Sequence, residues 1–192
     1  MKRVFIVHGW DGSPDEPWLK WLRCELVRRG IFVVSGQMPQ VATPHIATWV
    51  PALAKLVGTP DEDTYFVGHS VGCSTVLRYI ESLSEGTKAG GAVFVAPWAK
   101  SLTNLEDDEE TQTIAKEWLD TPIDFAKVRV RLPKSVAIFS DNDKFVPLDN
   151  QEVFRDKFNS KIIIEHGLGH MSPDDDVEQV PSILSSALSL LE

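Results

Sequence analysis

Residues 64–72 read Thr-Tyr-Phe-Val-Gly-His-Ser-Val-Gly. The first four are apolar, aromatic or β-branched, which is typical of a buried strand, and Val71–Ser84 has an amphipathic helical pattern. Between them, Gly68-His69-Ser70-Val71-Gly72 has the G-x-S-x-G spacing of a sharp strand-to-helix turn. Such a turn projects the serine hydroxyl from the edge of a sheet, and the glycines avoid collisions with neighbouring backbone. The stretch therefore predicts Ser70 as a nucleophile.

Short strands and helical patterns alternate along the rest of the chain. The predicted strands are Arg3–Val7, Ile31–Ser35, Thr64–Val67, Ala92–Ala96, Ser135–Phe139 and Lys161–Glu165. The predicted helices are Glu16–Arg28, Ile46–Val57, Val71–Ser84, Glu109–Leu119, Asp149–Phe158 and Val177–Leu191. Strands that are apolar throughout and separated by helices indicate a parallel sheet covered on both faces. We therefore expect one α/β domain over residues 1–192, a three-layer sandwich with a six-stranded, mainly parallel sheet.

Composition and charge exclude several classes of function. The 192 residues carry a net charge of −9, which argues against a basic surface for nucleic acid. The longest apolar runs, such as Val4–Val7, are far shorter than the roughly 20 residues that span a bilayer. Because Met1-Lys2-Arg3 leads directly into a strand, we expect a cytoplasmic protein without a membrane partner. Cys24 and Cys73 form no Cys-x-x-Cys pair, so reduced thiols are expected, with no metal and no cofactor.

Residues 97–134 form the longest connection between predicted strands. Their acidic run, Glu106–Glu110, is interpreted as solvated surface and a helix N-terminus, because its spacing is not that of a calcium loop. The basic segment Lys127–Arg131 is interpreted as a solvated segment with one buried face, and not as an anion site. This connection has room for about one helix, so we do not expect a large closed lid.

The partners of Ser70 are expected at the carboxyl ends of later strands, because these ends share one edge of a parallel sheet. A serine hydroxyl needs a base, and in this architecture the chain order is Ser, Asp, His. Asp143 follows the fifth strand in a D-x-x-V-P segment and is favoured over Asp141, which could cap the turn. His170 follows a flexible Gly-Leu-Gly after the sixth strand and is favoured over His166 at the strand end.

Loop residues supply further predicted site groups. The backbone amides of Val71, directly after the nucleophile, and Trp10, after the first strand, would form an oxyanion hole. The alternative for Trp10 is packing on a glycine-rich turn. Trp98 and Trp118 would add apolar walls for substrate binding, or would only pack in the core. His69 is expected to support the turn at Ser70 by packing or hydrogen bonding.

These motifs resemble the small serine hydrolases related to retinoblastoma-binding protein 9, over essentially the whole chain. The segments that carry the resemblance are the immediate first strand, Gln37-Met38-Pro39, Gly68–Gly72, Asp143–Pro147 and Gly169-His170. The resemblance implies a reduced α/β-hydrolase fold without a leading antiparallel hairpin, and a triad of Ser70, Asp143 and His170. Leu22–Leu26 lacks the final Glu of the L-x-C-x-E peptide for the retinoblastoma protein, so no protein partner is transferred.

The combined prediction is a metal-free serine hydrolase that cleaves an acyl bond through an acyl-enzyme. Its expected partner is a small-molecule acyl substrate, with a small carboxylic ester preferred. Two alternatives stay open. One is a catalytically idle hydrolase fold that binds a protein, and the other is an acyltransferase, amidase or thioesterase that uses the same triad.

Overall fold

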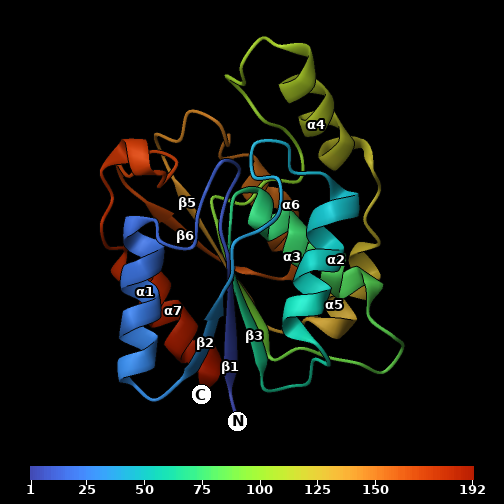
Figure 1. Ribbon diagram of the computed structural model, residues 1–192, viewed down its shortest axis with the longest axis vertical. Helices are drawn as coiled ribbons and strands as arrows, with labels where there is room; N and C mark the ends of the chain where they lie inside the picture. The colour runs from blue at the N-terminus through green and yellow to red at the C-terminus, as the bar shows by residue number, and fades with distance from the viewer.

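A computed structural model describes residues 1–192, and its six strands form a single sheet (Figure 1). The strands are β1 (Arg3–Val7), β2 (Phe32–Ser35), β3 (Thr64–His69), β4 (Gly91–Val95), β5 (Ser135–Ser140) and β6 (Lys161–Glu165). They lie in the order β2-β1-β3-β4-β5-β6, and every neighbouring pair is parallel. The predicted six-stranded parallel sheet is confirmed, with strand ends that differ from the prediction by about two residues at most.

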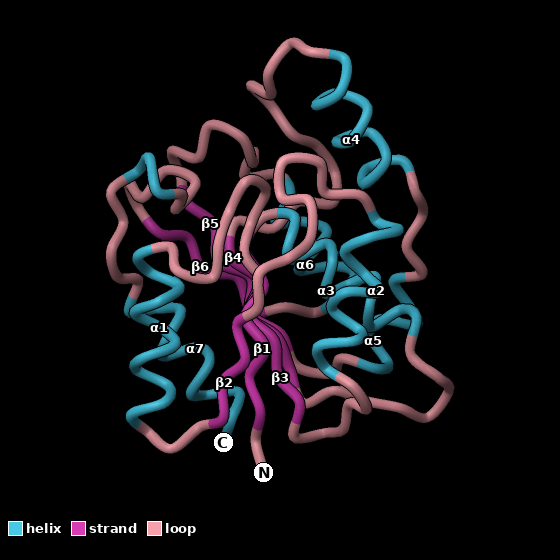
Figure 2. The backbone as a smooth tube through the Cα atoms, in the orientation of Figure 1, coloured by secondary structure: helices cyan, strands magenta, loops and turns pink.

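Helices cover both faces of this sheet and complete the three-layer sandwich. On one face lie α1 (Pro17–Arg28) and α7 (Pro181–Leu191), and on the other α2 (Ile46–Val57), α3 (Val71–Ser82), α5 (Phe125–Arg131) and α6 (Asn150–Phe158) (Figures 1 and 2). Two clusters of 26 and 19 buried hydrophobic residues fill the space between the sheet and its helices. Burial of this apolar surface supplies the main free energy that holds the layers together. None of the helices has both the length and the apolar character needed to span a membrane.

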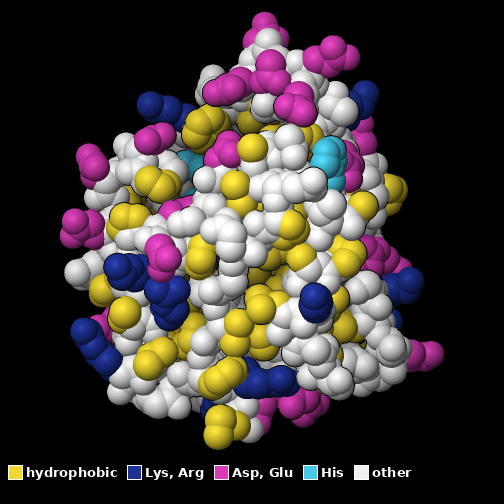
Figure 3. Space-filling model, in the orientation of Figure 1, with side chains coloured by type: hydrophobic (Ala, Val, Ile, Leu, Met, Phe, Trp, Pro, Cys, Tyr) yellow, Lys and Arg dark blue, Asp and Glu magenta, His cyan; other side chains and the backbone are white.

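The connection of residues 97–134 holds two helices where the sequence predicted about one. The first is α4 (Glu109–Asp120), and Asp108 caps it by accepting from the Thr111 amide at 2.9 Å. The acidic run therefore lies at a helix N-terminus, as predicted, and acidic side chains gather over α4 (Figure 3). The second helix, α5, includes the basic segment. Side chains two positions apart on a helix point in different directions, so Val128 is buried while Val130 is 67% exposed.

The carboxyl ends of the parallel strands meet at one edge of the sheet, and α4 stands beyond that edge (Figure 2). The two chain termini lie together at the opposite edge (Figure 1). The loops after β1, β3, β4, β5 and β6 therefore come together at this edge, and they carry Trp10, Ser70, Trp98, Asp143 and His170. A short 3₁₀ helix, η1 (Pro173–Asp175), follows β6, and α7 begins at Pro181, four residues later than predicted.

Candidate active site

Ser70 stands between β3 and α3 in a strained backbone conformation. Its φ is 51° and its ψ is −120°, a region that residues other than glycine rarely adopt. The turn is tight because its two glycines lack side chains. A Cβ at Gly72 would lie 2.4 Å from the Val7 carbonyl oxygen, and one at Gly68 would lie 2.8 Å from a backbone nitrogen of α3. The structure thus forms the sharp turn that the motif predicted.

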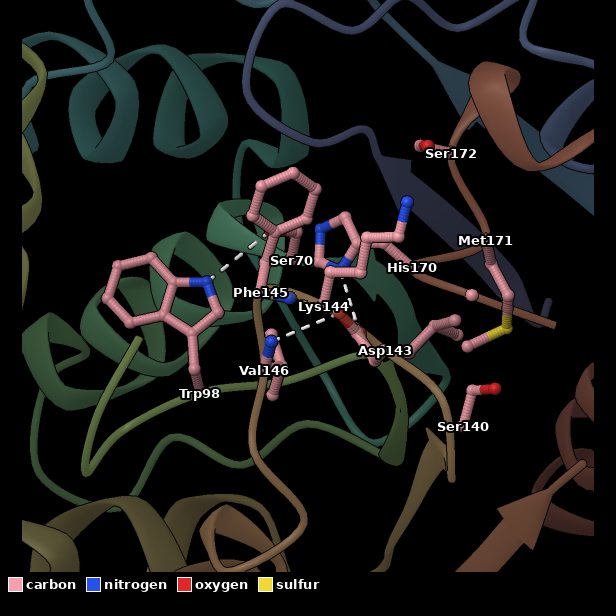
Figure 4. Close-up of polar contacts among 12 residues, drawn as sticks. Ser70, Trp98, Ser140, Asp143, Lys144, Phe145, Val146, His170, Met171 and Ser172 are labelled. Carbon is pink, nitrogen blue, oxygen red and sulfur yellow. Dashed lines mark hydrogen bonds and ion pairs between the residues drawn. The ribbon is translucent and has the colours of Figure 1, made fainter. Parts of the chain in front are cut away.

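Asp143 and His170 are joined at the same edge of the sheet. His170 Nδ1 lies 2.8 Å from Asp143 Oδ2, and Asp143 Oδ1 accepts from the amides of Phe145 at 2.8 Å and Val146 at 3.0 Å (Figure 4). The Asp143 side chain is 2% exposed. Because a carboxylate accepts, Nδ1 carries the hydrogen of the neutral ring, which leaves Nε2 with a lone pair. His170 can therefore act as a base through Nε2.

Asp141 and His166 pair with each other. Asp141 Oδ2 lies 2.6 Å from His166 Nδ1, and Asp141 Oδ1 accepts from the Gly167 amide at 2.9 Å. The hydrogen bond between them lowers the pKa of Asp141 and raises the pKa of His166. Ser140 Oγ and Asn142 Oδ1 each accept a hydrogen bond from a further backbone amide of the loop after β6. This segment therefore ties the loop after β6 to the loop after β5, the turn-holding role considered for Asp141.

Ser70 and His170 line one cavity of about 480 Å³, a size typical of sites for small ligands. Its apolar wall consists of Trp10, Trp98, Leu102, Leu105 and Phe145. Its exposed charged groups are the carboxylates of Asp11, Glu106 and Asp174, and no Lys or Arg lines it. The indole Nε1 of Trp98 points at Ser70 and donates to Oγ at 3.4 Å (Figure 4).

Trp118 does not reach this cavity, contrary to the predicted substrate-binding role. It is 3% exposed, its indole nitrogen donates to the Pro44 carbonyl at 2.6 Å, and its ring lies 5.7 Å from the Arg78 guanidinium. Its place on α4 turns it toward α2 and α3, where it packs in the core that anchors α4. Trp118 therefore has the other role expected for it, which is packing in the core.

The loop after β1 presents Trp10 beside Ser70. His8 fixes this loop, because its Nδ1 donates to the Gly9 carbonyl at 2.8 Å and its Nε2 accepts from the Met38 amide at 2.9 Å. The Trp10 indole donates to the loop that follows β2. No protein group accepts a hydrogen bond from the backbone amide of Trp10 or of Val71. Both amides are therefore free to donate to an oxygen atom of a bound molecule.

Three residues that support His170 were not identified as site residues from sequence. Asp175 Oδ2 accepts from the His170 amide at 3.0 Å, and it also accepts from Ser172. Position 169 requires glycine, since the φ of Gly169 is 58° and a Cβ at this position would lie 2.0 Å from Asp175 Oδ1. The available signal was the S-x-x-D spacing of Ser172 and Asp175, which resembles a capping box.

Asn150 was also missed, and no local pattern indicates it. This fully buried side chain accepts from the amides of Ala99, Lys100 and Ser101 and donates to the carbonyls of Ser101 and Pro147. It thereby joins the loop after β4, which carries Trp98, to the loop that carries Asp143.

No cluster of three or more His, Cys, Asp or Glu side chains has a metal-binding arrangement.

The strained serine, the Asp–His pair and the parallel sheet together define an α/β-hydrolase. A family model described as serine hydrolase matches residues 4–188, and the chain belongs to this family. The protein is thus an enzyme of the serine hydrolase class, and the resemblance found in the sequence is confirmed.

Two relatives extend this comparison. The Bacillus subtilis protein YdeN is 28% identical over 183 residues, which cover 95% of this chain and 92% of YdeN. The crystal structure of the ydeN gene product superposes with a TM-score of 0.89 at 26% identity, covering 99% of this chain and 98% of that one. The serine hydrolase RBBP9 of Rattus norvegicus is 24% identical over 185 residues, which cover 94% of this chain and 89% of RBBP9.

Proposed function

We propose that this enzyme hydrolyses small carboxylic esters through an acyl-enzyme on Ser70, with His170 as general base and Asp143 as its partner. The observation that carries the proposal is the 2.8 Å contact between His170 Nδ1 and Asp143 Oδ2, in a ring that lines the same cavity as Ser70. Ser70 and His170 share no direct hydrogen bond in the free enzyme, which is common before substrate binds.

In the first half-reaction, Ser70 Oγ attacks the acyl carbon while His170 Nε2 takes the hydroxyl proton. The tetrahedral oxyanion accepts hydrogen bonds from the Val71 and Trp10 amides, each worth roughly 3 kcal/mol in the transition state. The intermediate collapses, the C–O bond to the alcohol breaks, and His170 gives the proton to the alcohol. Water then attacks the acyl-enzyme by the same route and releases the acid.

The cavity supports a choice of substrate. Trp10, Trp98 and Phe145 offer flat apolar surface to an acyl or aryl group. We propose a small-molecule acyl substrate, with no nucleic acid or membrane partner, because the chain is acidic and no Lys or Arg lines the cavity to bind phosphate groups. The two cysteines form no disulfide, which supports a cytoplasmic location.

The proposal is tested with a fluorophosphonate probe, which phosphonylates activated serines. The wild-type protein should be labelled at Ser70 as mapped by mass spectrometry, and Ser70→Ala should lose both labelling and cleavage of 4-nitrophenyl acetate. Ser185, an exposed serine on α7 that does not line the cavity, provides the control: Ser185→Ala should still be labelled at position 70. Labelling of the Ser70→Ala variant at another serine would disprove the assignment.

A further inference from the structure

A second pair of titratable side chains, Glu16 and His69, lies beside the proposed triad and has no part in the mechanism above. Glu16 directly precedes α1, and His69 ends β3 next to Ser70. Their side chains are 5% and 3% exposed, and Glu16 Oε2 lies 3.9 Å from His69 Nδ1. Neither of these two atoms has a hydrogen-bond partner. Buried polar atoms are nearly always paired, so this arrangement needs an explanation.

The other polar atoms of the pair have partners. His69 Nε2 lies 2.9 Å from the carbonyl oxygen of His170. Because a carbonyl only accepts, Nε2 carries the hydrogen, and Nδ1 of the neutral ring is an acceptor. Glu16 Oε1 accepts from the Ser13 amide at 2.9 Å. Burial lowers the pKa of His69 to about 3 and raises the pKa of Glu16, so each group favours its neutral form.

These constraints determine how many protons the two facing atoms hold. A Glu16 carboxylate opposite a neutral Nδ1 would set two acceptors against each other, whereas one proton on either atom makes a donor and an acceptor. A side-chain movement of about 1 Å brings the two atoms to hydrogen-bond distance. We infer that Glu16 and His69 share one proton and act as positioning residues that hold the backbone of His170 in place.

The loop that carries the proposed oxyanion amide packs against the same pair. A Cβ at Gly9 would lie 2.9 Å from His69 Nδ1, and a Cβ at Gly12 would lie 2.3 Å from Glu16 Oε1. Loss of the shared proton would push the two side chains apart, against this loop on one side and against His170 on the other. One proton therefore positions both the oxyanion loop and the general base of the proposed function, on which this inference rests.

Other titratable groups face the pair from three loops. His170 and Asp143 lie after β6 and β5, and His8 lies after β1. Positive charge on His170 lowers the pKa of both Glu16 and His69. Burial lowers the pKa of His8, whose Nε2 already accepts a hydrogen bond. The pair consequently keeps its proton best while His170 is neutral, which is the state in which His170 acts as a base.

The test compares Glu16→Gln with Glu16→Leu, using kcat and KM for 4-nitrophenyl acetate over a wide pH range. In the wild type, kcat should fall as pH rises and the shared proton is lost. A glutamine amide donates to His69 Nδ1 at every pH, so Glu16→Gln should keep most of kcat and lose this decline with rising pH. Glu16→Leu cannot donate, and its kcat should drop by up to about 10²-fold with little change in KM, the scale of a 1 Å misplacement.

A decline of kcat with rising pH that is unchanged in Glu16→Gln would overturn the inference, as would wild-type kcat in a folded Glu16→Leu variant. If Glu16→Leu does not fold by circular dichroism, the comparison between the wild type and Glu16→Gln decides alone. Fluorophosphonate labelling of wild-type Ser70 separates the two proposals. Without labelling, the proposed function fails; with labelling and the wrong pH pattern, only the shared proton fails.

Discussion

His170 Nδ1 lies 2.8 Å from Asp143 Oδ2, and backbone amides occupy the other carboxylate oxygen of Asp143. Both oxygens of this buried carboxylate thus have partners, which fixes the orientation of the imidazole. Asp141, two positions earlier, makes a contact of similar length to an exposed histidine. The two Asp–His pairs are chemically alike and differ in burial and in access to the cavity.

This difference predicts unequal effects for two matched substitutions. Asp143→Asn should lower kcat by roughly 10⁴-fold, because the amide no longer holds the ring in its working tautomer. Asp141→Asn should have a small effect, since its side chain holds a loop and does not touch His170. Steady-state kinetics of both variants give the ranking. A larger loss of kcat in Asp141→Asn would show that the wrong acid was assigned.

Trp98 is expected to orient the nucleophile as well as to form the cavity wall. Its Nε1 donates to Ser70 Oγ at 3.4 Å, so Trp98→Phe removes one donor while keeping most of the ring. We expect kcat to fall about fivefold, the scale of one neutral hydrogen bond. Trp98→Ala is a poorer probe, because the side chain is 2% exposed and its loss costs about 3–5 kcal/mol of stability. An unchanged kcat in a stably folded Trp98→Phe variant would contradict this role.

Charge around the cavity predicts discrimination among esters. Asp11, Glu106 and Asp174 line the cavity without a neighbouring Lys or Arg among its lining residues. A short neutral aryl ester should therefore be cleaved faster than one with an added carboxylate, by roughly tenfold in kcat/KM at low salt. Added salt should reduce the difference in kcat/KM between the neutral and the anionic ester. Emulsified long-chain triglyceride should be a poor substrate, and a preference for the anionic ester would contradict the charge argument.

The acid side of the pH profile should report one histidine. Burial lowers the pKa of His8 and lowers that of His69 to about 3, so both rings stay neutral when an exposed imidazole would be protonated. As pH falls, kcat/KM should fall along a single ionisation, because the mechanism uses one neutral base. A metal chelator should change nothing. Two acid ionisations, or activity that is lost in chelator and restored by a divalent ion, would contradict the mechanism.

The two thiols should differ sharply in reactivity. Cys24 is exposed, whereas Cys73 is buried beneath the turn at Ser70, and burial raises the pKa of the Cys73 thiol. A thiol reagent should modify Cys24 alone in the native enzyme and both cysteines in denaturant, with activity unaffected by the first modification. Rapid native reaction at Cys73 would show that the helix after the nucleophile opens easily.

The sequence revealed the features that depend on short stretches of chain. Ser70 lies in a five-residue motif, and Asp143 and His170 each follow a strand whose apolar pattern is unmistakable, so topology brings them together. Trp118 and Asn150 depend on segments far apart in the chain. The local sequence around a tryptophan does not show whether it packs in the core, as Trp118 does, or lines the cavity. The five hydrogen bonds of Asn150 join two loops, and no sequence pattern indicates that these loops lie side by side. Helix α5 was missed because it has only seven residues and its basic residues alternate with Val128 and Val130, a period of two that is not helical, although Asp124 caps it by accepting from the Lys127 amide.

Both chain termini lie at the edge of the sheet opposite the cavity (Figure 1). A tether attached at either end therefore leads away from the mouth through which substrate enters. The enzyme can be fixed to a solid support, or joined to a second protein, with its opening turned toward the solution. Anchoring through an added surface residue near α4 would instead turn that opening toward the support.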